Sequence, residues 1–294
     1  MKLNSKILLF LLLIISANGF AQRVIDGDTT QPVAKSSYWK WTRHGNLYFA
    51  WGYNKEWYTK SDIHINTNIS GEKAEYTLWN VNARDHIGWD ELFHAQLTIP
   101  QYNYRIGYFF NKTQDLGVEL SFDHTKFVVI SPQTVHISGT SNGVAFDSTA
   151  HLYPDSTYGP KPFYYQLNNG ANFFFVSLMK KFQLYKSHSG KIDFSYIAKG
   201  GVGWCIPHVQ NVIFGNYNDP HFQFGGWDVS VESALRCVFF KYVYLDFAQR
   251  GTYASYSHLR IAGGLAKQNF GCYELILTLG LNIPQRIKAP THGD

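Results

Sequence analysis

Two histidines and an aspartate stand at intervals of four residues in the stretch DHIGWDELFH. The residues are His86, Asp90 and His94. On a helix, this spacing places all three side chains on one face, where they could bind zinc. However, Gly88 weakens a helix at this point, and the sequence indicates neither a fourth ligand nor a general base. We therefore favour a solvated loop here, and we expect no cofactor.

A second acid and histidine stand side by side in FDHTKF, as Asp123 and His124. A carboxylate that orients an imidazole can make it a general base. The surrounding alternation predicts a strand, however, and adjacent residues of a strand point to opposite faces. A structural role for both side chains is the favoured interpretation.

A third candidate lies in the stretch SHLRIAGGLAKQNFGCYE, near the end of the chain. This stretch resembles the lipid A deacylases of the PagL type, which are eight-stranded outer-membrane barrels. The resemblance implies a triad of a histidine, a serine two residues further on, and a later glutamate. His258 and Glu274 match two of these positions, but Arg260 replaces the serine, and Ser257 precedes the histidine. Lipid A hydrolysis therefore stays an alternative, and a non-enzymatic role is favoured.

The strand that must position Glu274 covers 269–283, NFGCYELILTLGLNI. Successive side chains of a strand point to opposite faces, and here one face is apolar while the other includes the acid. The length and position suit the last strand of a membrane barrel, which needs about 9–11 residues to cross. The apolar face consists of Tyr273, Leu275, Leu277, Leu279, Leu281 and Ile283.

Seven earlier segments show a similar alternation, so we predict an all-β, antiparallel up-and-down transmembrane barrel of eight strands. Long connections alternate with short ones, as in membrane barrels with long extracellular loops and short periplasmic turns. A further strand-like stretch, EYTLWNV (75–81), leaves ten strands as an alternative. The seven segments are 44–53, 99–110, 116–123, 171–185, 191–204, 226–240 and 243–253.

The alternation does not itself decide which face points inwards, since a soluble ligand-binding barrel has an apolar interior. Charged residues make up only 16% of the chain, too few to cover a soluble surface of ordinary composition. Tyrosine and tryptophan also gather near strand ends, as they do at membrane interfaces. We therefore place the apolar face in lipid. The interfacial aromatic residues would be Trp51, Tyr53, Tyr102, Trp204, Trp227 and Tyr273.

The polar face then lines a lumen that eight strands leave just wide enough for side chains to fill. Buried charges must pair with one another, so we favour a salt-bridged plug over a narrow pathway for solutes or ions. The predicted lumen charges are Arg105, Lys181, Lys199, Arg236 and Arg250, together with Glu119, Asp123, Asp193, Asp228, Glu232, Asp246 and Glu274.

The chain begins with a basic residue pair, an apolar run and small residues, which predict a signal peptide over residues 1–21. A polar lead (22–44), the barrel (45–283) and a periplasmic tail (284–294) would follow. The net charge of +5 falls to +3 without the signal peptide. This charge is neither high nor clustered enough for a nucleic-acid partner.

Across the mature chain, the pattern resembles small Gram-negative outer-membrane barrels of the OmpA, OmpX and OmpW kind. WGYNKEWYTKSDIHI, IPQYNYRIGYFF and FDHTKFVV also resemble an uncharacterised Bacteroidota-type barrel group, which implies no activity. We expect the outer membrane as location, with membrane lipid and lipopolysaccharide as neighbours. The loops are rich in aromatic residues, which predicts either a binding surface for a protein or glycan, or a folded cap over the barrel mouth.

Overall fold

The computed structural model describes residues 45–85, 101–110, 113–157, 159, 161–167 and 170–284. The predicted signal peptide, polar lead and C-terminal tail lie outside these residues, apart from Pro284, and so do His86, Asp90 and His94. Within the described residues, no helix is long and apolar enough to cross a membrane. Their secondary structure consists of strands, β1–β17.

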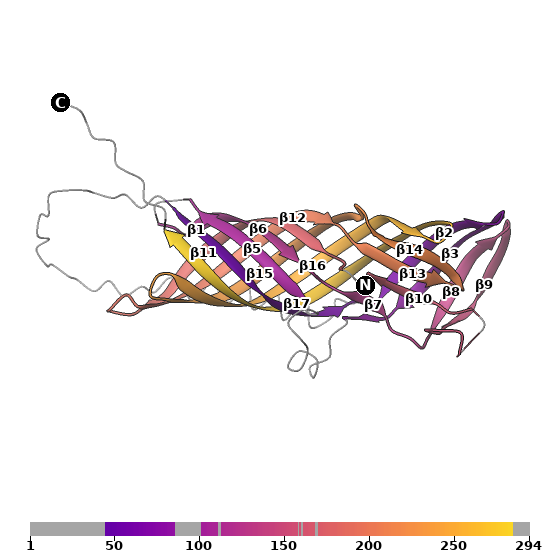
Figure 1. Ribbon diagram of the computed structural model, residues 1–294, viewed down its shortest axis with the longest axis horizontal. Helices are drawn as coiled ribbons and strands as arrows, with labels where there is room; N and C mark the ends of the chain where they lie inside the picture. The colour runs from indigo at the N-terminus through magenta and orange to yellow at the C-terminus, as the bar shows by residue number, and fades with distance from the viewer. Residues whose placement is uncertain are drawn as a thin grey trace, which may run out of the picture.

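Eight of the strands form one closed antiparallel ring (Figure 1). Its closure comes from β1 and β17, whose thirteen paired positions run from Asn46 opposite Pro284 to Tyr58 opposite Cys272. The eight-stranded barrel predicted from the sequence is therefore confirmed. In ring order the strands are β1 (Asn46–Tyr58), β5 (Tyr102–Phe109), β6 (Leu116–Asp123), β11 (Phe173–Lys186), β12 (Ile192–Cys205), β15 (Gly226–Phe239), β16 (Val243–Ile261) and β17 (Gly264–Pro284).

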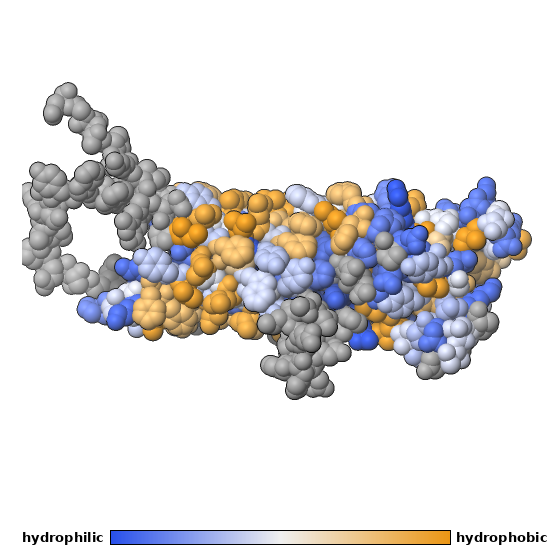
Figure 2. All heavy atoms as spheres, in the orientation of Figure 1, coloured by the Kyte–Doolittle hydropathy of each residue, from blue (hydrophilic) through white to orange (hydrophobic). Residues whose placement is uncertain are grey.

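The outside of the barrel is apolar, and its inside carries the charges. On β17, Leu277, Leu279 and Leu281 are each more than half exposed on the outside, whereas Glu274 is completely buried inside. Apolar residues accordingly dominate the surface of the barrel half in Figure 2, while hydrophilic residues dominate the opposite end. The barrel thus has the inverse of a soluble protein's polarity, as a lipid environment requires.

The connections divide by length between the two ends of the barrel. Those at one end join β5 to β6, β11 to β12 and β15 to β16 over a few residues. We call this the turn end. At the other end, the connections after β1, β6 and β12 contain additional strands. By the rule for membrane barrels, this loop end faces the outside of the cell.

The additional strands assemble into two sheets that we call the cap. The first continues the barrel sheet, because β17 pairs with β2 through Gly264–Gln268 above the barrel. Its added strands, in order, are β2 (Ser61–Ile69), β3 (Glu72–Val81), β8 (Gln133–Ser141) and β9 (Val144–Leu152). The second has the order β14 (Asn216–Phe222), β13 (His208–Ile213), β10 (Tyr164–Leu167), β7 (Phe127–Val129) and β4 (Ala83–Arg84).

Two expectations about these connections need correction. The stretch EYTLWNV lies in β3 of the cap, so the ten-strand alternative is wrong. Residues 257–268, which lie between the predicted strands 243–253 and 269–283, instead form the outer ends of β16 and β17. Leu259, Ile261 and Ala266 from this hairpin are buried, because their side chains face the interior of the cap.

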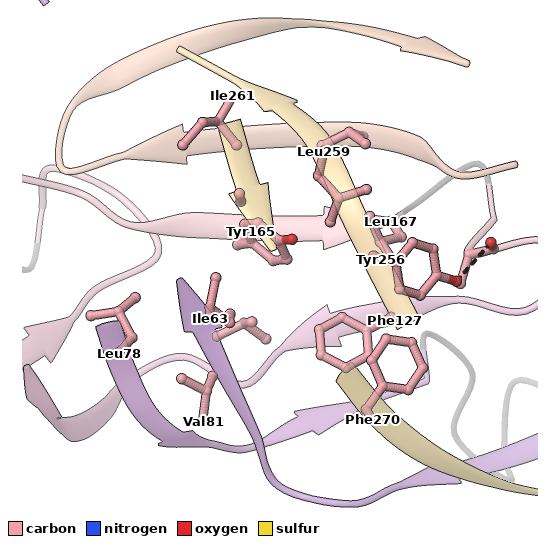
Figure 3. Packing of buried hydrophobic residues seen from close by; sticks show 14 of the residues in the cluster. Ile63, Leu78, Val81, Phe127, Tyr165, Leu167, Tyr256, Leu259, Ile261 and Phe270 are labelled. Atoms are coloured by element: carbon pink, nitrogen blue, oxygen red, sulfur yellow. Dashed lines mark hydrogen bonds between the residues drawn. The ribbon is translucent and has the colours of Figure 1, made fainter. Parts of the chain in front are cut away.

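One apolar core holds the cap together, and it draws on all four connections at the loop end. Figure 3 shows Ile63, Leu78 and Val81 turned towards Tyr165 and Ile261. The core continues downwards into the barrel through aromatic side chains, with Phe127 stacked on Phe270 at 4.7 Å between ring centroids. Loop aromatic residues such as Phe163 thus pack into a folded cap, which is one of the two expectations for them.

Candidate functional sites in the lumen and the cap

Six charged side chains form a compact network in the middle of the lumen. Glu232 is its hub, with Oε1 lying 2.7 Å from Arg105 Nη1 and 3.0 Å from Lys199 Nζ. Arg250 contacts the other oxygen of the same carboxylate. The network contains three cations and three anions, so its charges cancel. Its other anions are Glu119, which pairs with Arg105 and Lys199, and Asp123, which pairs with Arg105 and Arg250.

A separate ion pair lies nearer the turn end. Arg236 binds Asp246 with both Nε and Nη2, at 2.8 and 2.7 Å. The guanidinium is also 3.9 Å from the ring centroid of Tyr244 and 4.4 Å from that of Tyr48. Tyr48 in turn donates a hydrogen bond to Glu119. This hydroxyl connects the pair to the central network.

Apolar clusters close the lumen on both sides of the central network. On the turn side, Tyr48, Phe109 and Met179 pack with other fully buried residues. On the cap side, the ring of Phe175 covers the guanidinium of Arg250, with 4.7 Å between Cζ and the ring centroid. The aromatic core of the cap begins with Phe175. Among the described residues, the central network therefore lies between two apolar clusters.

Three predicted lumen acids lie outside both the central network and the Arg236–Asp246 pair. Asp193 is half-buried at the turn end, where Gln183 donates a hydrogen bond to it. Asp228 is buried 3.5 Å from the Sγ of Cys205. We expected Glu274 to pair with a cation, and this expectation needs correction. Its cross-strand neighbour Arg250 turns instead towards Asp123 and Glu232.

Lys181, also predicted in the lumen, is half-buried near the turn end. Its ammonium lies 4.9 Å from the ring centroid of Phe109. Lys181 therefore packs against the apolar cluster on the turn side, outside the central network.

Glu274 faces Glu56 instead, a lumen residue that is not among the charges predicted from the sequence. The two glutamates are register partners on β17 and β1. Glu56 accepts hydrogen bonds from the hydroxyl of Tyr58 and the backbone N–H of Lys126. Burial lowers the pKa of the Lys126 ammonium, while nearby Glu56 acts in the opposite direction. Asn54 and Glu56 continue the inward parity of Tyr48, and the predicted strand ends at Tyr53, three residues before Glu56.

The structure does not assemble the candidate catalytic groups into a hydrolytic site. His258 is exposed in the cap and hydrogen-bonds with Ser257 at 2.8 Å, whereas Glu274 is enclosed in the lumen. Asp123 belongs to the ion network. His124 stacks on Tyr102 and bonds to Asn172 Oδ1. Neither the His258–Glu274 pair nor the Asp123–His124 pair can therefore act as an acid–base unit in this geometry.

A groove of about 960 Å³ crosses the outer face of the cap's first sheet. Residues of this sheet alternate between the apolar core and the groove; Ile63 and Ile65 face the core, while His64 and Asn66 face the groove. Its polar lining includes imidazole, amide, hydroxyl and charged groups: His64, Asn66, Asn68, Glu75, Thr77, Ser138, Thr140, His258 and Lys267.

A smaller hollow of about 540 Å³ shares His258 and Leu265 with the groove. Phe222 and Phe224 line it and are 60% and 70% exposed, which is unusual for large apolar side chains. The two hollows adjoin at these shared residues, and we call them together the depression, with polar groups in the groove and two exposed aromatic rings in the smaller hollow. This combination is the clearest candidate binding surface among the described residues.

The closed ring, the apolar exterior and the packed ionic interior define a small β-barrel of the outer-membrane type. No protein-family model matches the chain, and no curated protein matches its sequence. These comparisons therefore assign no family within this class.

Among solved structures, the chain is similar to the outer membrane protein AlkL. The identity is 12% and the TM-score 0.39, over 90% of this chain and 100% of that one. It is also similar to the outer membrane protease OmpT of Escherichia coli, at 10% identity and a TM-score of 0.36, over 85% and 99% of the two chains. A third neighbour is Ail of Yersinia pestis, at 11% identity and a TM-score of 0.31, over 82% and 99%.

These neighbours are outer-membrane barrels, as the broader resemblance of the sequence implied. The narrower resemblance to a Bacteroidota-type group finds no support among them. Likenesses this low carry no argument about what this chain binds or catalyses.

Proposed function

We propose that this protein is a surface-exposed binding element of the outer membrane, in which a sealed barrel anchors a folded extracellular domain. The observation that carries this proposal is the apolar core of the cap, which fixes segments of every long connection in one body. Loops held on a rigid scaffold are suited to recognition. The packed lumen argues for an anchor and against a solute pathway.

The depression on the cap is the proposed binding site, and its chemistry suits an oligosaccharide. Sugar hydroxyls both donate and accept hydrogen bonds, as do the hydroxyl and amide groups along the groove. Hydrogen bonds hold some of these groups in place, including His64 Nδ1 with Thr77 Oγ1 at 2.7 Å and Trp79 Nε1 with Ser138 Oγ at 2.8 Å. Exposed Phe222 and Phe224 offer flat surfaces for the apolar face of a sugar ring.

The test is a binding measurement on the full-length protein in detergent, using oligosaccharides released from lipopolysaccharide and a panel of surface glycans. His258→Ala and Lys267→Ala remove groups that line the groove. His188→Ala and Lys191→Ala make the same changes on exposed residues at the turn end and serve as matched controls. We expect each groove variant to bind about two- to tenfold more weakly, since a hydrogen bond contributes on the order of 0.5–1.5 kcal/mol.

Unchanged binding in the groove variants, or absence of glycan binding by the unmodified protein, would refute the proposed site. Lipid A from producing cells should also be examined by mass spectrometry. A loss of acyl chains that depends on the protein would show a hydrolase and overturn the non-enzymatic function.

A further inference from the structure

The second cap sheet ends in two edge strands, and both are protected against pairing with another chain. At one end, β4 is only two residues long. At the other end, β14 contains Pro220, which has no backbone N–H to donate. Asn218 of β14 also bonds through Nδ2 to Arg260 O of β16, which lies beside it. Short strands, proline and covering elements are devices by which proteins protect sheet edges.

The first cap sheet ends in β9, which shows none of these devices in the described part of the chain. This strand is nine residues long, and it contains neither proline nor lysine. Its pairing with β8 runs without a break in register, and no described strand lies on its other side. Figure 1 shows β9 at the end of the molecule away from the barrel. Its outer edge is therefore open to another strand.

The turn that joins β8 to β9 determines which backbone groups lie on this edge. Asn142 and Gly143 have positive φ angles of 49° and 82°, as in the two-residue turns of tight hairpins. The flanking pair Ser141–Val144 is then hydrogen-bonded, and hydrogen-bonded pairs alternate along an antiparallel ladder. A bond from Asn142 N to Lys73 O of β3 fits this alternation. Even-numbered residues of β9 thus bond to β8, and odd-numbered residues direct their N–H and C=O groups outwards.

The side chains at the odd-numbered positions are complementary to themselves about Thr149. Asp147 and His151 lie at equal distances along the strand before and after Thr149, and all three are exposed. Asp147 Oδ1 bonds with His136 Nε2, and His151 Nδ1 bonds with Thr134 Oγ1, each at 2.8 Å. Each bond occupies one of the two polar atoms of the β9 side chain. Asp147 Oδ2 and His151 Nε2 remain for a partner.

We propose that β9 pairs with β9 of a second copy of this chain, in an antiparallel arrangement centred on Thr149. Thr149 then lies opposite Thr149 of the partner subunit, and Asp147 lies opposite the partner's His151. The same contact occurs twice, once on each side of the two-fold axis. Each of these residues has outward backbone groups, so each pair exchanges backbone hydrogen bonds. The first cap sheet becomes continuous across the two copies.

The side chains also favour this register over its neighbours. A two-fold pairing centred on Asp147 places two aspartates directly opposite each other, which is destabilising. Pairings centred on Ser148 or Ala150 place Asp147 opposite a threonine or a tyrosine. In the register centred on Thr149, each aspartate faces a histidine, and such complementary cross-strand pairs stabilise a sheet.

The first test measures the mass of the full-length protein in detergent by sedimentation equilibrium over a range of concentrations. Thr149→Pro removes an outward N–H and leaves the bonds between β9 and β8 in place. Thr149→Ala retains this N–H and is the matched control. We expect a dimer for the unmodified protein and the control. The proline variant should associate about tenfold more weakly or less, because each copy loses a hydrogen bond.

The second test examines the register with a short bis-maleimide cross-linker. Opposite residues of a hydrogen-bonded pair lie about 5.5 Å apart between Cα atoms, so Thr149→Cys should give cross-linked dimers. Ala145→Cys is the control, because its thiol lies on the same edge but roughly 27 Å from its copy, at about 3.4 Å per residue. Both variants also carry Cys237→Ser, since Cys237 is half-buried while the other cysteines are buried.

A third test exchanges the complementary side chains. Asp147→His places two histidines opposite each other, and His151→Asp places two aspartates opposite each other. Each single variant should weaken the dimer, and the double variant should bind more tightly than either one. Gel mobility with and without heating shows that each variant is folded.

The proposal is overturned if the unmodified protein is a monomer at every concentration. It is equally overturned if folded Thr149→Pro protein dimerises as strongly as Thr149→Ala, since the copies would then meet elsewhere. Cross-linking of Ala145→Cys at the level of Thr149→Cys contradicts the register. A double variant that binds no better than the single variants contradicts the contact between Asp147 and the partner's His151.

Discussion

Arg105 of β5 and Glu232 of β15 meet across the barrel lumen, with 2.7 Å between Nη1 and Oε1. Three strands separate β5 from β15 in the ring, so the contact joins walls that no hairpin connects. Both side chains are almost completely buried. The ion network therefore acts as an internal cross-link whose geometry exists only in the closed barrel.

Glu232→Gln should lower the free energy of unfolding by about 3–5 kcal/mol, because it leaves buried cations without their shared carboxylate. Urea unfolding in lipid vesicles measures this difference. Asp147→Asn affects an exposed pair with His136 and should cost no more than about 1 kcal/mol. Similar losses in the two variants would contradict a network that depends on Glu232.

Leu279→Arg should cost about 2–4 kcal/mol, since it places a charge on the lipid-facing side of β17. Leu265→Arg makes the same change further along this strand, on the outer face of the cap, and should cost much less. Unfolding free energies in vesicles compare the two. Equal costs would mean that the lipid boundary does not lie between these residues.

The reconstituted protein should show no large, steady conductance in a planar bilayer. The reason is the sequence of packed layers in the lumen, in which Phe175 covers Arg250 and the cap core lies above it. Single-channel recording is the measurement. An ion-selective, stable current would show that the lumen opens and would support the pore alternative.

Deletion of Ser61–Arg84 should unfold the cap while the barrel stays inserted. The deletion removes β2 and β3, with core residues Ile63, Ile65 and Leu78, and it separates β8 from β17. Limited proteolysis of intact cells should then cleave the remaining long connections, while heat-modifiable gel mobility persists. A cap that stays protease-resistant would contradict the single core.

The barrel was predictable because the membrane strands follow a two-residue period over most of their length. Residues that face lipid must be apolar, and residues that face the lumen must fit its polar interior. The choice of residue type is therefore restricted at both sets of alternate positions, as on β17. The cap was not predictable in the same way. The cap strand β9 lies at the edge of its sheet and is exposed over most of its length, so its sequence alternates weakly.

The ion pairs in the lumen could not be predicted from the sequence, for a different reason. Strand parity indicates that Arg250 and Glu274 both point inwards, and they are neighbours in register. Whether they bind each other depends on which groups reach them across the lumen, which follows from the stagger of the closed ring. Arg250 reaches Asp123 and Glu232, and Glu274 is left facing Glu56.

Because β17 both closes the ring with β1 and carries β2 on its outer end, the order of assembly is constrained. The β2–β3 hairpin comes early in the chain, yet its hydrogen-bonding partner Gly264–Gln268 is in the last strand. The cap sheet therefore cannot be completed while the C-terminal strand is unplaced. The cap therefore folds fully only after the barrel has closed. An antibody that binds only the folded cap would detect molecules whose barrel is fully inserted.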